Sequence, residues 1–242
     1  MTIPQLSFSL IIPCYNEAAS LPALIDRCGA IFSRDDVEVI LVDNGSTDDS
    51  PTILANLLAG HPVLRTVRVE RNQGYGHGIL TGLRAARGRV LGWTHADLQT
   101  DPADVLRGLA LFETAPDRDR LFVKGRRSGR PFSDIVFTVG MSCFETLLLR
   151  RPLWDINAQP TIFSRGLFES WDHPPQDFSL DLYAYYRARC LGFAIARFPV
   201  HFGKRIHGVS HWNINWRAKV KFIRRTVDFS LRLRRSLKDS RT

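Results

Sequence analysis

The chain has 242 residues, of which 44% are hydrophobic, so it is long enough to bury the core of one large domain. Its net charge of +9 does not indicate a nucleic-acid-binding protein, because residues 212–242 hold ten Lys and Arg against two Asp, whereas residues 1–211 hold 23 basic and 22 acidic residues. No membrane span, secretory signal or close cysteine pair is visible, which favours a reduced, cytoplasmic protein without a zinc site.

Short β-prone runs alternate with helical patterns through the first half of the chain. Strands are expected at residues 8–16, 37–46, 64–70 and 89–94, and helices at residues 20–32, after the cap residues 46–50, and at about 75–86. This alternation predicts an α/β fold with a mostly parallel sheet and helices on both faces. Ligands bind such sheets beyond the carboxyl ends of the strands, so the candidate site is formed by residues 13–17, 42–48 and 94–99.

The second half of the chain is expected to continue the pattern less regularly. Helices are predicted from Pro102 to about residue 113 and at residues 133–149, 178–192 and 216–237, strands at residues 121–127 and 194–202, and an irregular stretch at residues 151–165. No repeat or low-complexity linker marks a second domain. We therefore expect one domain at residues 1–211, followed by a helical tail at residues 212–242.

Asp43 ends a predicted strand and is followed by the turn residues NGSTD. Its carboxylate either accepts hydrogen bonds from the base or ribose of a nucleotide, or caps the next helix in an Asx-turn, for which Asn44, Ser46 and Thr47 are also suited. Three glycines in RNQGYGHG, Gly76 among them, open the next helix and allow backbone N–H groups to approach an anion. Their spacing matches neither a dinucleotide-binding fingerprint nor a P-loop.

The stretch HADLQTDP places His95, Asp97 and Gln99 at alternate positions after a strand. If the strand geometry persists, their side chains point to one side and converge on one cation. Mg²⁺ and Mn²⁺ both take carboxylate and carbonyl oxygens, and an ion in such a site is shared with substrate phosphates. Alternatively, these residues meet water or cap the next helix, a role for which Asp101 is better placed than Asp97.

Four motifs in this order, IIPCYNE, VDNGSTDDS, RNQGYGHGILTGLRAARG and HADLQTDP, resemble those of the family 2 glycosyltransferases of GT-A fold, especially the dolichol-phosphate and polyprenyl-phosphate sugar transferases. The resemblance covers roughly the first 130 residues, and VKGRRSGR, DINAQPTIFSR and RIHGVS are weaker counterparts of that subgroup's acceptor-side segments. It implies an inverting transfer of a hexose from a GDP- or UDP-sugar to a lipid phosphate.

The resemblance also assigns roles to individual residues. It implies that Pro13, Tyr15 and Glu17 line the nucleotide pocket, and that Asp43 meets the base or ribose. Asp97 and Gln99 hold Mg²⁺ or Mn²⁺ on the diphosphate, and Asp97 is the foremost candidate. The remaining candidates for donor binding are Asn44, Gly76, His95 and Arg205.

His95 departs from the family pattern, because the usual motif reads DAD where this chain has HAD. A neutral imidazole removes one negative charge and disfavours Mg²⁺ relative to Mn²⁺. Either His95 binds the metal ion through nitrogen, or it lies outside the metal shell and contacts phosphate or sugar. The second alternative is slightly favoured, because Asp97, Gln99, the diphosphate and water suffice for the ion.

The acceptor determines which catalytic groups are needed. A phosphate monoester is largely ionised at pH 7 and attacks the anomeric carbon without a strong base, so the enzyme positions it and neutralises its charge. Arg126, Arg127 and Arg130 are the candidates for that clamp, as is Arg205, and a solvated basic loop is the alternative. A hydroxyl acceptor would need a base, for which Asp181 is the candidate. Further candidates near acceptor, sugar or diphosphate are Asn157, Gln159, His207 and His211.

The tail helix has an apolar side and a basic side. The apolar side carries Trp216, Val220, Ile223, Val227 and Leu231, and the basic side carries Arg217, Lys221, Arg224, Arg225, Arg232 and Arg235. Such a helix either lies on an anionic membrane surface, here the inner face of the cytoplasmic membrane, or packs on the domain or on a second subunit.

Two rival functions fit the same motifs. The first is a glycosyltransferase with a saccharide or other hydroxyl acceptor. The second is a nucleotide-sugar-binding protein whose catalysis was weakened by the change to HAD. A nucleotidyltransferase is disfavoured, because IIPCYNEAAS lacks a Gly-rich loop with a basic residue.

Overall fold

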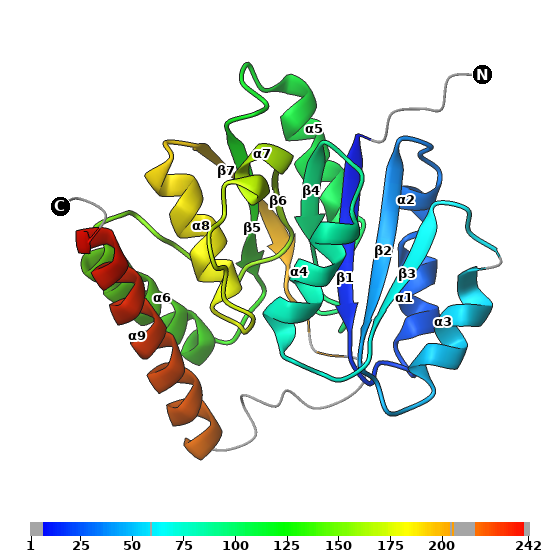
Figure 1. Cartoon of the computed structure of the whole chain (residues 1–242), viewed down its shortest axis with the longest axis horizontal. Helices are drawn as coiled ribbons and strands as arrows, with labels where there is room; N and C mark the ends of the chain where they lie inside the picture. Colours follow the sequence, from blue (N-terminus) through cyan, green and yellow to red (C-terminus); the bar gives the residue numbers. More distant parts are fainter. Residues whose placement is uncertain (1–6, 59, 204, 206–215, 240–242) are drawn as a thin grey trace.

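A computed structural model of the chain describes residues 7–58, 60–203, 205 and 216–239. Its centre is a seven-stranded sheet in the order β3-β2-β1-β4-β6-β5-β7, with helices on both faces (Figure 1). The strands are β1 (Phe8–Cys14), β2 (Val37–Asn44), β3 (Leu64–Val69), β4 (Val90–Trp93), β5 (Leu121–Ser128), β6 (Thr161–Ser164) and β7 (Ala194–His201). The predicted α/β fold is confirmed.

Two layers of helices enclose the sheet. The helices are α1 (Leu21–Arg27), α2 (Gly29–Phe32), α3 (Ser50–Leu58), α4 (Tyr75–Ala85), α5 (Asp104–Thr114), α6 (Phe132–Leu149), α7 (Arg165–Glu169), α8 (Leu180–Cys190) and α9 (Trp216–Asp239). Alternate residues of each strand face opposite layers. In β1, Leu10 and Ile12 pack with α1, α2, α3 and α5, while Ile11 packs with α4, α7 and α8.

The structure corrects the sequence prediction at three places. Residues 151–165 were expected to be irregular, yet they contain β6, which pairs antiparallel with both β4 and β5. The helix expected at residues 20–32 is divided into α1 and α2 at Cys28. The strand expected at residues 89–94 ends at Trp93, so its geometry does not continue to Gln99.

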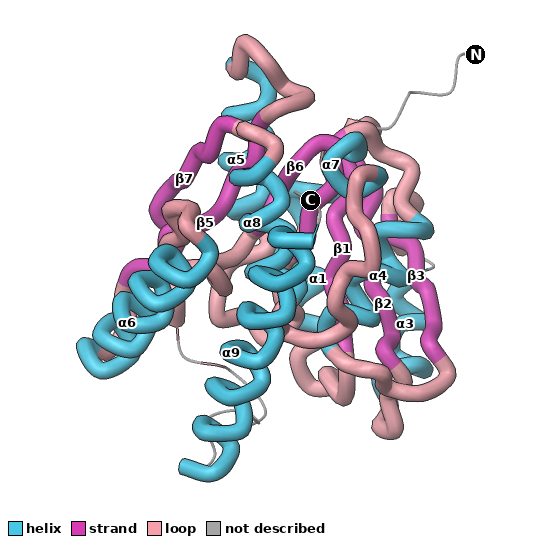
Figure 2. Tube along the Cα trace, turned by 60° about the vertical axis from the view of Figure 1, so that its left-hand side comes forward, coloured by secondary structure: helices cyan, strands magenta, loops and turns pink. Residues whose placement is uncertain are grey.

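α6 and α9 lie side by side outside the α/β layers, where Ser230 Oγ of α9 donates a 2.8 Å hydrogen bond to Glu145 Oε1 of α6 (Figures 1 and 2). α9 also packs on the core through Phe229 and Leu233, rather than through the predicted apolar side, of which Val220 and Leu231 are exposed. α6 is long and apolar enough to cross a membrane by length and composition, and only 22% of it is buried. The sequence analysis did not identify this helix as a candidate span.

Candidate functional site

The loop after β1 is hydrogen-bonded to the loop after β2. Asn16 N–H donates to Ser46 Oγ at 3.1 Å, and Glu17 N–H donates to Ser50 Oγ at 3.0 Å. Asn16 has a positive φ of 54°, and its Oδ1 accepts a hydrogen bond from Thr47 N–H at 2.8 Å. Pro13 and Tyr15 therefore border a connected polar rim at the carboxyl edge of the sheet. Sequence analysis did not single out Asn16, although Asn is the non-glycine residue best suited to a positive φ.

At the end of β2 lie two buried side chains with unused acceptor atoms. Asp43 Oδ1 accepts a hydrogen bond from Ser46 N–H at 2.9 Å, which confirms the Asx-turn, while Oδ2 is buried with Arg68 Nε at 3.7 Å. Asn44 Nδ2 donates to Gly74 O at 2.9 Å. Neither Asp43 Oδ2 nor Asn44 Oδ1 accepts a hydrogen bond from the described part of the chain. Buried acceptors normally have donors, so these two atoms suit the N–H and O–H groups of a ligand.

The glycines at the start of α4 make room for another part of the chain. A Cβ atom on Gly74, whose φ is +112°, would lie 2.8 Å from Gln176 O, and one on Gly76 would lie 2.6 Å from Asp177 O. His77 N–H donates to Gln176 O at 2.8 Å. These glycines thus allow the backbone of residues 176–177 to pack closely on α4, whereas the sequence predicted that they allow an anion to approach. A role for Gly76 in nucleotide binding stays a prediction.

Residues 97–99, which we call the 97–99 loop, form a tight turn. Leu98 is buried with a positive φ of 57°, so His95, Asp97 and Gln99 do not follow one another as in a strand. Asp97 Oδ1 accepts a 3.2 Å hydrogen bond from Gln99 N–H. Asp101 Oδ1 accepts a hydrogen bond from Ala103 N–H at 2.9 Å in the turn before α5, but the N-cap of that helix is Ala103, which has no side-chain cap hydrogen bond.

Arg205 reaches this loop from the end of β7. Its Nη2 lies 2.9 Å from Asp97 Oδ2. Two hydrogen bonds hold the preceding backbone in place: Gly203 N–H donates to Gln99 O at 2.7 Å, and Gln99 Nε2 donates to Gly203 O at 3.2 Å. Burial raises the pKa of Glu17, on which Arg205 has a lowering and Asp97 a raising effect. Asp97, Arg205 and Glu17 thus share one charged centre.

His95 stands in a column of aromatic rings. Its imidazole is stacked on Tyr75 with ring centroids 5.3 Å apart, and Tyr75 is stacked on Phe178 at 4.7 Å. Burial, followed by the nearby Asp181 charge, raises the pKa of Tyr75. This packing brings His95 into contact with α4, whose Tyr75 is in turn stacked on Phe178, before α8. Its role as a metal ligand stays a prediction.

Asp181 is enclosed in a buried polar network behind the aromatic rings. Its Oδ1 accepts hydrogen bonds from Gln159 Nε2 at 2.8 Å and from Trp93 Nε1 at 3.3 Å, and Lys124 Nζ lies 3.8 Å away. Lys124 is fully buried, donates to Thr161 Oγ1 at 2.7 Å, and has a pKa that burial lowers to about 8. These contacts are those of a positioning residue rather than of an accessible base.

Three arginines surround one buried carboxylate at the end of β5. Arg127 Nε lies 2.9 Å from Asp155 Oδ1, Arg130 Nη2 lies 3.7 Å from the same oxygen, and Arg197 Nη2 lies 3.8 Å from Oδ2. We call these four residues the arginine cluster. Burial raises the pKa of Asp155, but the arginine charges and hydrogen bonds outweigh it and the pKa is lowered. Arg126, by contrast, is exposed.

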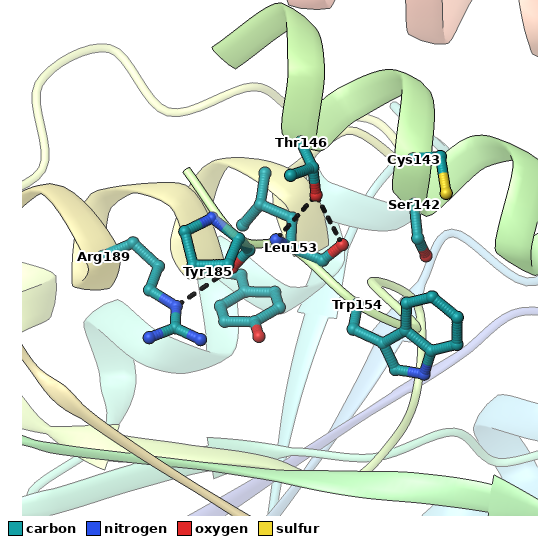
Figure 3. Close-up of a pocket in the computed structure, with 8 residues that line it drawn as sticks. Ser142, Cys143, Thr146, Leu153, Trp154, Tyr185 and Arg189 are labelled. Atoms are coloured by element: carbon teal, nitrogen blue, oxygen red, sulfur yellow. Dashed lines mark hydrogen bonds between the residues drawn. The ribbon is translucent and has the colours of Figure 1, made fainter. Parts of the chain in front are cut away.

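A cavity of about 290 Å³ lies between α6, α8 and residues 152–154 (Figure 3). Its walls are mostly apolar, and they are formed by Ser142, Cys143, Thr146, Pro152, Leu153, Trp154, Tyr185 and Arg189. Asp155 N–H donates to Ser142 Oγ at 3.1 Å, and Arg197 donates to Trp154 O. The same short segment therefore contributes to the cavity wall and to the arginine cluster.

The remaining candidates are placed less centrally. Asn157 is exposed, and Gln159 is buried in the Asp181 network. His207 and His211 lie outside the described residues. Sequence analysis missed Lys124 and Asp155, because a charged residue that is buried with its partner gives no signal in a single sequence.

The 97–99 loop offers oxygen ligands of the kind that Mg²⁺ and Mn²⁺ prefer. Asp97 supplies a carboxylate and Gln99 a carboxamide oxygen, and a cation, Arg205, already lies at Asp97. Among the described residues no group of three His, Cys, Asp or Glu is arranged to hold a metal. An ion here would therefore take its other ligands from phosphate and water, as Mg²⁺ commonly does. The residues present fit such an ion.

Part of this chain is similar in sequence to known proteins. The chain is 36% identical over 118 residues to an undecaprenyl-phosphate 4-deoxy-4-formamido-L-arabinose transferase of Yersinia pestis (strain Pestoides F), covering 47% of this chain and 36% of that protein. It is also 36% identical over 107 residues to a dodecaprenyl-phosphate galacturonate synthase of Rhizobium johnstonii, covering 43% and 31%. The matched part thus spans about a third of the length of these curated relatives.

Solved structures share the fold. The mannosyltransferase PcManGT from Pyrobaculum calidifontis, in complex with GDP-Man and Mn²⁺, has a TM-score of 0.62 at 24% identity over 83% of this chain and 57% of that one. Glucosyl-3-phosphoglycerate synthase from Mycobacterium tuberculosis, in complex with Mn²⁺, UDP and phosphoglyceric acid, reaches 0.67 at 20% identity over 94% and 78%. The model of glycosyl transferase family 2 matches residues 9–133, just over half of the chain, including the loops after β1, β2 and β4. The chain is therefore a member of glycosyl transferase family 2.

Proposed function

We propose that the protein transfers a hexose from a nucleoside diphosphate sugar to a polyprenyl phosphate, with inversion at the anomeric carbon and with a divalent metal ion on the diphosphate. The observation that carries this proposal is the charged centre of Asp97, Arg205 and Glu17, which lies at the carboxyl edge of the sheet together with the unused acceptors of Asp43 and Asn44. The curated relatives are named for polyprenyl-phosphate substrates, which supports the acceptor.

The donor is proposed to lie across the ends of β1, β2 and β4. Asp43 Oδ2 would accept hydrogen bonds from the base or ribose, and Tyr15, which is exposed, would cover that part of the nucleotide. Asp97 and Gln99 would hold the metal ion, which when bound would supply positive charge for the diphosphate leaving group. Arg205 would add a second positive charge at the same place.

The acceptor is proposed to use the arginine cluster and the adjacent cavity. Three arginines around one carboxylate leave an excess positive charge that suits a phosphate, and Arg126 adds another on the exposed side. The apolar walls beside it suit the first isoprene units of a lipid. The enclosed position of Asp181 favours this acceptor over a hydroxyl compound, which would need an accessible base.

The proposed reaction forms one bond and breaks one. An acceptor phosphate oxygen attacks the anomeric carbon as the bond from that carbon to the diphosphate breaks, so the nucleoside diphosphate leaves and the configuration inverts. The attacking oxygen is already ionised, and the chain contributes position and charge. The test is incubation with labelled GDP- and UDP-sugars and a polyprenyl phosphate. Label in the organic phase supports the proposal, and label only on a soluble saccharide would contradict it.

The role of His95 can be tested through metal preference. If its imidazole is a ligand, His95→Asp should shift the ratio of turnover with Mg²⁺ to that with Mn²⁺ toward Mg²⁺ by about tenfold, since a carboxylate oxygen suits Mg²⁺ better than nitrogen. The aromatic contacts favour the other alternative, in which the ratio changes little. The measurement is turnover over a range of each metal, with Tyr75→Phe as a control for the stacked rings.

Membrane contact is proposed for α6 and α9 together. α6 exposes Phe132 and Leu147, each at 80%, and buries Glu145, whose pKa burial raises to about 7, while α9 exposes Arg224, Arg232 and Arg235. Apolar side chains can enter the interface of a bilayer, and the arginines are attracted to anionic headgroups.

Changing Arg224, Arg232 and Arg235 together to Gln should weaken binding to anionic vesicles by about a hundredfold at low salt, because each basic residue contributes about 1 kcal/mol. The measurement is vesicle sedimentation, and the matched control changes the exposed Arg27, Arg84 and Arg89 to Gln. Equal vesicle binding by both variants would contradict the proposed contact of α9 with the membrane.

A further inference from the structure

Arg205 holds the carboxylate that the proposed function assigns to the metal ion. Asp97 Oδ2 is 2.9 Å from Arg205 Nη2, and Asp97 Oδ1 accepts the hydrogen bond from Gln99 N–H. Both oxygens therefore have donors without any ligand. A metal ion at Oδ2 would have to displace the guanidinium or lie against a second positive charge, and two like charges at such distances repel each other strongly when they are shielded from water.

The contact between Arg205 and Asp97 is supported by the backbone on both sides. The two hydrogen bonds between Gly203 and Gln99 hold the backbone two residues before Arg205 in place. Leu98, between Asp97 and Gln99, has a positive φ that sets the bend of the 97–99 loop. The Arg205 side chain is 26% exposed and that of Asp97 9%, so solvent screens the pair only in part.

Arg205 also has a donor that the described chain leaves unused. Its Nε is buried and has no acceptor among the described residues, although the guanidinium has five N–H donors in a fixed plane. A diphosphate supplies several acceptor oxygens with negative charge, and a guanidinium binds such groups in a bidentate manner. Arg205 is therefore paired with the Asp97 carboxylate in the absence of nucleotide, and it has a donor, unused by the described chain, for the diphosphate of a bound nucleotide.

We propose that Arg205 competes with the divalent ion for Asp97, and that the diphosphate of the donor ends this competition by binding Arg205. The proposal rests on the proposed function for the place of the metal ion. It makes the metal site weak in the free protein and couples metal binding to nucleotide binding. Because such coupling is reciprocal, the ion must strengthen nucleotide binding by the same factor.

The experiment measures Mn²⁺ binding to the full chain by the electron paramagnetic resonance signal of free Mn²⁺, with no sugar transfer involved. Arg205→Gln should bind Mn²⁺ about tenfold more tightly than the wild type in the absence of nucleotide. Addition of UDP or GDP should strengthen Mn²⁺ binding in the wild type and strengthen it less in Arg205→Gln. Arg205→Lys, which keeps the charge, should lie close to the wild type in the absence of nucleotide.

Two controls keep the result interpretable. Asp97→Asn should abolish the added affinity in the Arg205→Gln background, and Arg34→Gln, which removes an arginine paired with Asp36 far from this edge of the sheet, should change nothing. Mn²⁺ affinity that is equal or weaker in Arg205→Gln, or undetectable in both proteins, would overturn the proposal. Failure of lipid glycosylation would overturn the proposed acceptor but would leave this binding result intact, so the two failures can be told apart.

Discussion

Asp97→Asn is expected to lower the rate of hexosyl transfer by about a thousandfold, which corresponds to about 4 kcal/mol of lost transition-state stabilisation. The neutral amide keeps the size of the side chain but provides one oxygen in place of two and no charge. It would hold a divalent ion poorly and would also release Arg205 from its 2.9 Å contact. The measurement is turnover at saturating donor and metal, together with the metal concentration for half-maximal rate.

Asp101→Asn is the matched control for that experiment. Asp101 lies four residues along the same connection, and its Oδ1 accepts from Ala103 N–H in the turn before α5, a role that Asn fills equally well. Its turnover should stay within about twofold of the wild type. For Asp97→Asn the free energy of unfolding should fall by less than about 1 kcal/mol, because the lost ion pair is partly exposed. Rates that fell equally in both variants would contradict a specific role for Asp97.

Lys124→Met is expected to lower the free energy of unfolding by about 3–5 kcal/mol, more than the other substitutions considered, because it leaves the buried Asp181 carboxylate without its charged partner. Met fits the space of the Lys stem, so a cavity contributes little. Trp93 and Gln159 still donate to Asp181, but neither brings a charge. The measurement is urea unfolding followed by circular dichroism, with the slope checked for constancy between variants.

The double variant Lys124→Met with Asp181→Asn separates charge from packing. Asn can keep the hydrogen bonds from Trp93 and Gln159 while removing the unpaired charge, so the double variant should be more stable than Lys124→Met alone. A double variant that is as unstable as the sum of the two single variants would show that the two charges do not interact. In that case the 3.8 Å distance between them would have no energetic meaning.

The sequence predicted the edge of the sheet well and the region between β5 and α8 poorly. In β2 the apolar run of residues 39–42 is followed at once by polar turn residues, so the Asx-turn at Asp43 could be given as one of two alternatives. β6 has only four residues and follows a long loop, so its run TIFS has too little pattern to distinguish a strand from a buried turn. Its antiparallel pairing is set by its neighbours β4 and β5.

The candidate site was predicted as a set of loops, but its internal contacts were not. The carboxylate of Asp97 was found from its place after β4, whereas Arg205 reaches it from 108 residues away in the chain. No local spacing reports a contact of that separation. The glycines at the start of α4 had a recognisable pattern, but the group that packs on them is the backbone of residues 176–177 and not an anion. Glycine allows any group to approach closely, so the pattern alone does not say which group does so.

The ring column of His95, Tyr75 and Phe178 continues beyond the site to the last helix. Arg225 of α9 lies over the Phe178 ring at 5.7 Å and pairs with Asp177 at 3.3 Å. The backbone of Asp177 in turn packs on Gly76, immediately after Tyr75. A displacement of α9 would remove the ion pair with Asp177 and the cation over Phe178, whose ring is stacked on Tyr75. A chain of contacts therefore connects the last helix to His95 at the candidate site.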